Sequence, residues 1–146
     1  MADPVNPANA TSMSMAAMSV AASALRAEQA RMRVIAENMA NADSVSSTAG
    51  GNPYRRQIPV FTPTTVEGGG KGVKMTTVAP DQTPFRTQYQ PGNPSADAKG
   101  YVKLPNVDPL IEALDMRDAQ RAYEANLSVI ETARQMQTST LGIISK

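Results

Sequence analysis

The sequence has no cysteine, which excludes disulfide bonds and thiolate chemistry. Histidine is also absent, so the commonest general base and the commonest metal ligand are missing. There is no tryptophan, and only two phenylalanines and four tyrosines are available for the aromatic burial that a large core normally uses. Nine methionines, which suit irregular or remade packing surfaces, partly replace them. This composition disfavours an enzyme and favours a packing surface.

Long hydrophobic runs are missing too. No run of 18 apolar residues occurs, so we expect no transmembrane helix. The segment Met13–Leu25 is small and apolar, but no basic residue precedes it and the first one is Arg26. A secretory signal needs a positive region before its apolar part. We therefore expect no cleaved signal peptide.

Charge is low and unevenly distributed. The net charge is +1, which points to neither nucleic acid nor acidic lipid as a partner. Residues 43–103 carry a net charge of +3, whereas residues 104–146 carry −2. Opposite signs on the middle and the C-terminal part could steer one copy onto another.

The first of three parts, residues 1–42, is predicted to form one long helix. Apolar residues recur with alternating spacings of three and four, as in a coiled-coil seam. We expect the helix to begin near Thr11 or Ser12, which are good N-caps, with Pro4 and Pro7 outside it. The predicted apolar seam consists of Met18, Ala21, Leu25, Met32, Ile35, Met39 and Ala42, interrupted by Glu28.

The last part, residues 104–146, is predicted to form the partner helix. Asp108 is a suitable N-cap and Pro109 a suitable first helical residue. The three-four rhythm continues from there with more polar interruptions, at Gln120, Arg134 and Gln137. The apolar members of this second seam are Met116, Tyr123, Leu127, Ile130, Leu141 and Ile144.

The middle part, residues 43–103, holds eight of the nine glycines and seven of the eleven prolines. Short strand-like runs at residues 54–61, 73–78 and 99–104 lie between them. We therefore predict an α+β fold in which two long terminal helices pair and a small, irregular β subdomain lies between them in the sequence. A helix over residues 11–42 would be roughly 48 Å long, longer than a compact globule of this size at about 40 Å, so we expect an elongated molecule.

Two paired helices bury apolar side chains on one side only. Each buried leucine or methionine contributes about 1.5–3 kcal/mol, against about 1–2 kcal/mol of backbone entropy for each ordered residue. Apolar residues off the seams, such as Met15, Val20, Val34 and Val129, also need cover. We predict that the terminal segments are poorly ordered in a free monomer and become helical when other subunits pack around them.

Three segments invite a chemical interpretation. The loop "EGGGKG" (67–72) lacks the Ser or Thr after Lys71 that a phosphate-binding loop requires, so we expect a flexible loop. Asp115 and Asp118 alternate with arginines, which is typical of a solvated helix face. A mildly basic group, formed by Tyr54, Arg55, Arg56, Lys71, Lys74 and Arg86, lacks the charge density of a nucleic-acid site, and we expect it to contact another subunit or an anionic cell-wall polymer. No catalytic, cofactor-binding or metal-binding residue is predicted.

Two asparagines stand at the end of the first seam. On a helix, Asn38 and Asn41 share a face. Asn41 fits a helix end, because asparagine tolerates the left-handed conformation found there. Asn38 lies one turn earlier, and a buried asparagine at a seam fixes the register between partners. We therefore predict that Asn38 faces a neighbouring helix or subunit.

The segment at 22–44, "ASALRAEQARMRVIAENMANADS", resembles the N-terminal signature of the flagellar rod and hook family. The segments at 123–136 and 141–146 resemble the C-terminal helix of that family, and the middle resembles its proximal-rod members. Ala24 stands where the family often has glycine, and Asn93 where histidine is common. The residues that match the family motifs are Asn38, Ala40, Asn41, Tyr123, Glu124, Ala125 and Asn126.

This resemblance implies a structural subunit without cofactors that is exported unfolded, without a cleaved signal, by the flagellar type III export apparatus. The subunit would assemble helically in the periplasm, with its terminal helices lining a tube. The implied partners are other copies of the chain, the rod proteins FlgB, FlgF and FlgG, the adaptor FliE, the MS ring and the P ring. Three alternatives stay open: another axial subunit of the same family, a two-helix adaptor that does not polymerise, and a hydrolase using Asp115 or Asp118.

Overall fold

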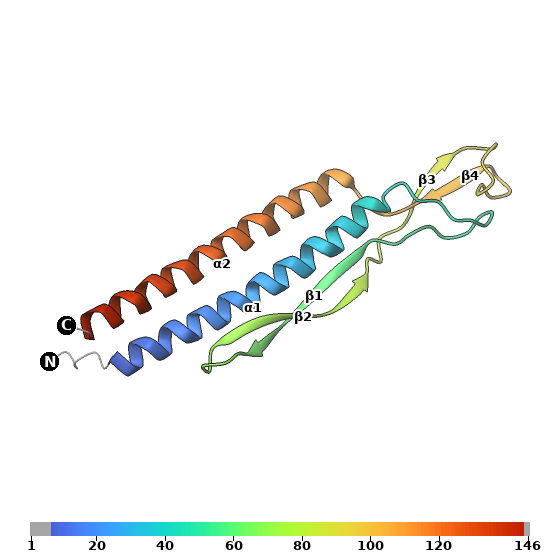
Figure 1. Cartoon of the computed structure of the whole chain (residues 1–146). Helices are drawn as coiled ribbons and strands as arrows, with labels where there is room; N and C mark the ends of the chain where they lie inside the picture. Colours follow the sequence, from blue (N-terminus) through green and yellow to red (C-terminus); the bar gives the residue numbers. More distant parts are fainter. Residues whose placement is uncertain (1–6, 145–146) are drawn as a thin grey trace. The chain divides into compact units, whose positions relative to one another are not determined.

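The computed structural model describes residues 7–144 and has the predicted α+β class. Two long helices enclose four strands in the sequence, and the strands form two separate two-stranded sheets (Figure 1). The elements are α1 (Pro7–Ala40), β1 (Gln57–Thr65), β2 (Lys71–Pro80), β3 (Arg86–Tyr89), β4 (Tyr101–Leu104) and α2 (Pro109–Ile144).

The described residues divide into two compact units. The first unit contains residues 7–30, 61–76 and 119–144, and the second contains residues 31–60 and 77–118. Each helix contributes residues to both units, and so does each strand of the β1–β2 sheet. None of the helices in residues 7–144 combines the length and the apolarity needed to cross a membrane.

Helix α1 begins earlier than expected. Its first residue is Pro7, so the predicted start near Thr11 or Ser12 is wrong by about one turn. Proline is well suited to this position, because the N–H that it lacks would have no partner within the helix and its φ angle is already helical. The prediction treated Pro7 as a barrier, whereas it opens the helix.

The end of α1 is formed by Asn41, but not through a left-handed backbone. Among the described residues only glycines have a positive φ. Instead, Nδ2 of Asn41 donates to the carbonyl of Glu37 at 2.8 Å, and the backbone N–H of Asn41 donates to the same oxygen at 3.2 Å. The backbone bond is an ordinary helical one, and the side chain of Asn41 gives the same carbonyl a second donor at the helix end.

The start of α2 is as predicted. Oδ1 of Asp108 accepts a hydrogen bond from the backbone N–H of Leu110 at 2.9 Å. The carbonyl of Asp108 accepts from the N–H of Glu112 at 3.0 Å, which is the first bond of the helix. Pro109 is the first helical residue.

In the first unit the two helices run side by side in opposite directions, with few large side chains between them. Nε2 of Gln137 on α2 donates to Oγ of Ser14 on α1 at 3.0 Å. The buried apolar residues of this unit are alanines: Ala21, Ala27, Ala119 and Ala133. A core of such small side chains lets backbones approach closely but contributes little burial energy.

The β1–β2 hairpin lies along α1 in the first unit (Figure 1). The buried hydroxyl of Ser23 accepts from the N–H of Val73 on β2 at 3.1 Å and donates to the carbonyl of Val20 at 2.7 Å. A Cβ atom on Gly70 would stand 2.7 Å from Val20, and one on Gly72 would stand 2.3 Å from the Ser23 hydroxyl. The glycines at 70 and 72 therefore let the hairpin approach α1 closely, whereas a Cβ on Gly69 would meet nothing within 4 Å. The flexibility expected of this loop stays a prediction.

The second unit contains the β3–β4 hairpin and a larger apolar core. β3 and β4 pair antiparallel, with Arg86 opposite Leu104 and Tyr89 opposite Tyr101. Strands at residues 54–61, 73–78 and 99–104 were expected, and each overlaps an observed strand, but β3 was not predicted. All four of its residues are exposed, so its sequence lacks the apolar alternation that marks a strand. The buried apolar residues of this unit are Val34, Ile35, Ala42, Val102 and Val107.

Candidate functional site

The predicted seam residues differ widely in exposure. Ile35 is buried, whereas Met39, Leu127 and Leu141 are exposed, Leu141 by 67%. The side chain of Ile144 lies outside the described residues. Ala21 and Ala42 are also buried, and the other seam residues are half-buried: Met18, Leu25, Met32, Met116, Tyr123 and Ile130. Their role in assembly stays a prediction.

On α2 the least exposed residues lie one position before members of the predicted seam. Glu112, Ala119 and Ala133 are buried, and Asn126 and Thr140 at the same seven-residue spacing are half-buried. Members of the expected series that lie one residue later, at positions 120, 127, 134 and 141, are all exposed. Leu127 and Leu141 are therefore open to another chain.

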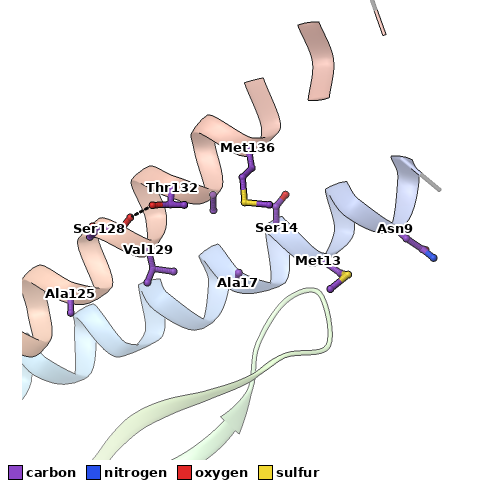
Figure 2. A pocket seen from close by; sticks show the side chains of 10 residues that line it. Asn9, Met13, Ser14, Ala17, Ala125, Ser128, Val129, Thr132 and Met136 are labelled. Carbon is purple, nitrogen blue, oxygen red and sulfur yellow. Dashed lines mark hydrogen bonds between the residues drawn. The ribbon is translucent and has the colours of Figure 1, made fainter. Parts of the chain in front are cut away.

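An apolar groove of about 700 Å³ lies between α1 and α2 in the first unit (Figure 2). Met13 and Met136, which are 73% and 59% exposed, stand at its rim. Ten residues line it, and none is charged: Asn9, Met13, Ser14 and Ala17 from α1, and Ala125, Ser128, Val129, Thr132, Ala133 and Met136 from α2.

Two of the four polar side chains that line this groove, those of Ser14 and Thr132, are already hydrogen-bonded. The Ser14 hydroxyl donates to the carbonyl of Thr11 at 2.9 Å, and the Thr132 hydroxyl donates to the carbonyl of Ser128 at 2.9 Å. Small-molecule sites usually combine an apolar lining with a few convergent polar groups. Because these two hydroxyls bond to carbonyls of their own helices, the groove offers mainly an apolar concave surface. Such a surface suits the binding of another apolar surface.

A second arrangement, in the other unit, centres on Asn38. This side chain is 1% exposed and makes four hydrogen bonds. Its Nδ2 donates to the carbonyl of Gln57 at 2.8 Å and to Oε2 of Glu112 at 3.2 Å. Its Oδ1 accepts from the hydroxyl of Tyr54 at 2.8 Å and from the N–H of Gln57 at 2.9 Å. Asn38 thus faces α2 and the start of β1 in its own chain.

Arg56 extends this arrangement. Its Nε donates to Oε1 of Glu112 at 2.5 Å, and Glu112 is 0% exposed. Its two terminal nitrogens lie 3.4 Å from Asp81 and 3.4 Å from Asp115. One guanidinium therefore joins the end of β2 to two successive turns of α2. We call Asn38, Tyr54, Arg56, Asp81 and Glu112 the Asn38 cluster.

The electrostatics of the cluster fit a structural role. Burial raises the pKa of Tyr54, and the charges of Glu37 and Glu112 raise it further, so its hydroxyl stays a donor. Desolvation would lower the pKa of Arg56, but hydrogen bonds and charges from Glu112 and Asp81 outweigh it and raise the pKa. The backbone N–H of Thr83 is the main cause of the lowered pKa of Asp81, and desolvation opposes it. All three pKa shifts favour the state that the hydrogen bonds require: a protonated Tyr54, a charged Arg56 and an ionised Asp81.

The expected basic group is divided between the units. Arg55 donates to the carbonyls of Asp81 and Thr83 and lies 4.1 Å from the ring centre of Phe85. Arg86 donates to the carbonyl of Pro105. Tyr54 and Arg56 belong to the Asn38 cluster, and Lys71 and Lys74 are exposed in the first unit. A contact of these residues with a subunit or an anionic polymer stays a prediction.

The remaining family-motif residues are mostly exposed. Ala40 is the last residue of α1, and Glu124 and Ala125 lie exposed on α2. Asn126 is half-buried, and its Nδ2 donates to the carbonyl of Ala122 at 2.8 Å.

The two carboxylates considered for catalysis lie in different surroundings. Asp115 lies beside Arg56, and Asp118 is exposed. Within residues 7–144 there is no group of three or more His, Cys, Asp or Glu side chains placed to hold a metal ion.

The sequence analysis did not predict Tyr54, Gln57 and Glu112 as partners of Asn38. The positions that Asn38 joins are 16, 19 and 74 residues away along the chain. No local pattern marks such contacts. The only available signal was a lone glutamate in the first turn of α2, which is also a common residue there.

Comparison with known proteins agrees with the two helical segments. The sequence model of the family described as "Flagella basal body rod protein" matches residues 18–46. The one described as "Flagellar basal body rod FlgEFG protein C-terminal" matches residues 98–143. These ranges contain all of α1 beyond its first three turns and nearly all of α2.

Whole-chain relatives cover the middle part as well, and each is named flagellar basal-body rod protein FlgC. The relative from Agrobacterium fabrum is 42% identical over 130 residues, covering 88% of this chain and 94% of the relative. The one from Escherichia coli O6:H1 is 46% identical, with 84% and 91% covered. The one from Aquifex aeolicus is 36% identical, with 82% and 89% covered. The chain therefore belongs to the FlgC family of flagellar basal-body rod proteins.

Proposed function

We propose that this structural subunit of the flagellar basal-body rod polymerises helically by burying the exposed faces of α1 and α2 in its first unit. The neighbours on these faces would be other copies of the chain and other rod-family subunits. The β-containing second unit would keep its own fold through the Asn38 cluster. The rod would thus be held together mainly by helix-to-helix packing.

One observation carries this proposal: the helical ends in the first unit expose apolar side chains and lack charge. No charged residue occurs in residues 7–25 or in residues 135–144. Large apolar side chains are exposed there, including Met13, Met15, Met136 and Leu141. A helix face that stays in water normally carries charged and polar residues. Faces that are exposed, apolar and uncharged are expected at subunit contacts.

The small core of the first unit supports the same conclusion. Its buried apolar residues are alanines, each contributing much less than a buried leucine or methionine. Covering Met136 and Leu141 would add about 1.5–3 kcal/mol each. Neighbouring subunits would therefore supply burial that the monomer lacks, and ordering of the helical ends would be coupled to assembly.

The order of the free monomer tests this coupling. Circular dichroism of a dilute monomer should show less helix than α1 and α2 contain together, and helix should increase on polymerisation. A dilute monomer that is fully helical and melts cooperatively would contradict coupled folding. A chain whose helical ends are unfolded before assembly could also cross a narrow export channel. We propose that the chain leaves the cytoplasm in this unfolded form, without a cleaved signal.

The neighbours are proposed from the family resemblance. FlgB, FlgF and FlgG would meet the chain along the rod, FliE and the MS ring at its base, and the P ring around it. Mass spectrometry of purified basal bodies, with cross-linking to assign neighbours, tests the whole proposal. The chain should be a stoichiometric component at the proximal part of the rod.

Three other functional interpretations make different predictions. Another axial subunit of the family would lie at a different height along the rod. A two-helix adaptor would remain a monomer or dimer and would be missing from purified basal bodies. A hydrolase would lose activity on Asp115→Asn while still assembling, whereas we expect this substitution to act only on stability, because Asp115 lies 3.4 Å from Arg56.

A further inference from the structure

The methionine side chains are the groups of this chain that a mild oxidant attacks first. The sequence has no cysteine and no tryptophan, so its nine methionines are its only sulfur-containing residues. An exposed thioether meets an oxidant more readily than a buried one. Among the described residues, Met13 and Met136 are the most exposed methionines, at 73% and 59%, followed by Met15 at 52% and Met39 at 40%.

The two most exposed methionines stand at the rim of the same groove. Met13 belongs to α1 and Met136 to α2 (Figure 2). The groove lining carries no charge, and the hydroxyls of Ser14 and Thr132 already donate to carbonyls of their own helices. The sulfur atoms that an oxidant reaches most easily therefore belong to an apolar surface that the proposed function buries.

Oxidation makes this surface polar. The sulfur attacks one oxygen of hydrogen peroxide, the O–O bond breaks, and the hydroxide that leaves takes the remaining proton and becomes water. The sulfur is oxidised by two electrons and the peroxide is reduced, so the thioether becomes a sulfoxide. The sulfoxide oxygen is a hydrogen-bond acceptor that water can satisfy only while the groove is open.

A sulfoxide should weaken any contact that covers the groove. Burial removes the water that bonds to the sulfoxide oxygen, and the donors of Ser14 and Thr132 are already in use. Burying a polar group without a hydrogen-bond partner is unfavourable, and the penalty corresponds to an affinity lower by roughly five- to 150-fold. This loss is the same whether another copy of the chain or a different subunit covers the groove.

We propose that Met13 and Met136 are oxidation sites, and that a subunit carrying methionine sulfoxide at these positions is excluded from the rod. The proposal rests on the proposed function, because it requires that assembly buries the groove. Once the groove is covered, both sulfur atoms are shielded from the oxidant. Sensitivity is therefore confined to the time between synthesis of the subunit and its incorporation.

The first test compares cells that carry only one version of the chain: the wild type, the double variant Met13→Leu with Met136→Leu, or Met39→Leu. Leucine has a similar volume and cannot be oxidised in this way. Met39 is the control, because it is exposed but lies in the second unit, outside the groove. Sublethal hydrogen peroxide is added while rods grow, and rods are counted by electron microscopy of purified basal bodies.

Peroxide should lower the number of rods in the wild type and in Met39→Leu, and should leave the number in the double variant unchanged. Damage to other components is common to all three strains, so a difference between the strains is due to this chain. Equal losses of rods in the wild type and in the double variant would overturn the proposal.

A second measurement needs no variant and decides the matter if the double variant assembles poorly. After removal of the peroxide, mass spectrometry measures sulfoxide at each methionine of the wild-type chain, in rods and in the unassembled pool. Sulfoxide at Met13 and Met136 should be roughly fivefold or more scarcer in rods, whereas sulfoxide at Met39 should be equally frequent in both pools. Equal sulfoxide at Met13 and Met136 in the two pools would contradict exclusion.

The proposed function fails by a different result. Absence of the chain from the basal bodies of untreated cells would contradict the proposed function itself. Rods that contain the chain and take up oxidised and unoxidised subunits equally would leave the proposed function standing and remove this inference.

Discussion

The side-chain amide of Asn38 donates to Oε2 of Glu112, and both side chains are buried. This hydrogen bond joins the last turn of α1 to the first turn of α2 across 74 residues of sequence. The other three bonds of Asn38 go to Tyr54 and to the backbone of Gln57. Asn38 therefore fixes where β1 starts relative to both helix ends within the second unit.

The first prediction concerns this residue. Asn38→Leu removes four hydrogen bonds and leaves buried groups of Gln57 and Glu112 without that partner. The free energy of unfolding should fall by about 2–4 kcal/mol, measured by urea denaturation. Asn41→Ala is the matched control, because Asn41 makes one exposed side-chain bond to Glu37, and it should cost about 1 kcal/mol or less. Equal losses from the two substitutions would contradict the role assigned to Asn38.

A second prediction concerns pH. The pKa of Asp81 lies below its ordinary value of 3.8, mainly because the N–H of Thr83 donates to its carboxylate at 2.9 Å. As pH falls, the unfolded chain takes up this proton first, so the stabilisation is complete above about pH 4 and is lost as pH falls through the folded pKa. Asp81→Asn should therefore lower the free energy of unfolding at pH 7 and have a smaller effect at pH 3.

Urea denaturation at several pH values checks this sign. The difference between the wild type and Asp81→Asn should shrink steadily below pH 4. A difference that stays constant between pH 7 and pH 3 would show that the Asp81 charge contributes nothing and that the substitution acts through packing alone.

A third prediction tests the packing of the hairpin on α1. A Cβ at Gly72 would meet the buried Ser23 hydroxyl at 2.3 Å and a methyl carbon of Val66 at 2.6 Å. Gly72→Ala should lower the free energy of unfolding by about 1–3 kcal/mol. Gly92→Ala is the control, since a Cβ there meets nothing within 4 Å, and it should be neutral or stabilising by up to about 1 kcal/mol. If Gly72→Ala proves as harmless as Gly92→Ala, the hairpin is not packed as described.

The two helices could be predicted from the sequence because they are long, periodic and marked at their ends. From Asp108 and Pro109 the first residue of α2 could be predicted correctly. The start of α1 differs from the prediction because Pro7 does not stop the helix but opens it, since proline is favourable at a first helical position. Strand β3 was missed because its exposed residues carry no apolar alternation.

The polar contacts were less predictable. The sequence pattern marked Asn38 as a side chain facing a neighbour, but it could not name Glu112, Tyr54 and Gln57, since only the folded chain brings them together. A glycine-rich loop predicts flexibility but not packing, so the close approach of Gly70 and Gly72 to α1 could not be predicted from the sequence. Ile35 is a poor position at which to test assembly, because it is 3% exposed and a charge there would unfold the second unit as well as disturb a seam.

Exposed residues of the first unit test assembly without this complication. Met136 is 59% exposed at the rim of the groove, so Met136→Asp should leave the fold of the chain intact while placing a charge in the proposed contact. Its neighbour Gln135 is exposed on α2 and is not among the groove residues, which makes Gln135→Asp the matched control.

The most direct measurement is the yield of rods in basal bodies purified from cells that carry each variant, counted by electron microscopy. Export of both variants and their unfolding by urea should match the wild type. We predict that Met136→Asp cells lack rods and do not swim, whereas Gln135→Asp cells assemble rods and swim normally. Normal rods and swimming in the Met136→Asp cells would contradict assembly through the exposed helix faces.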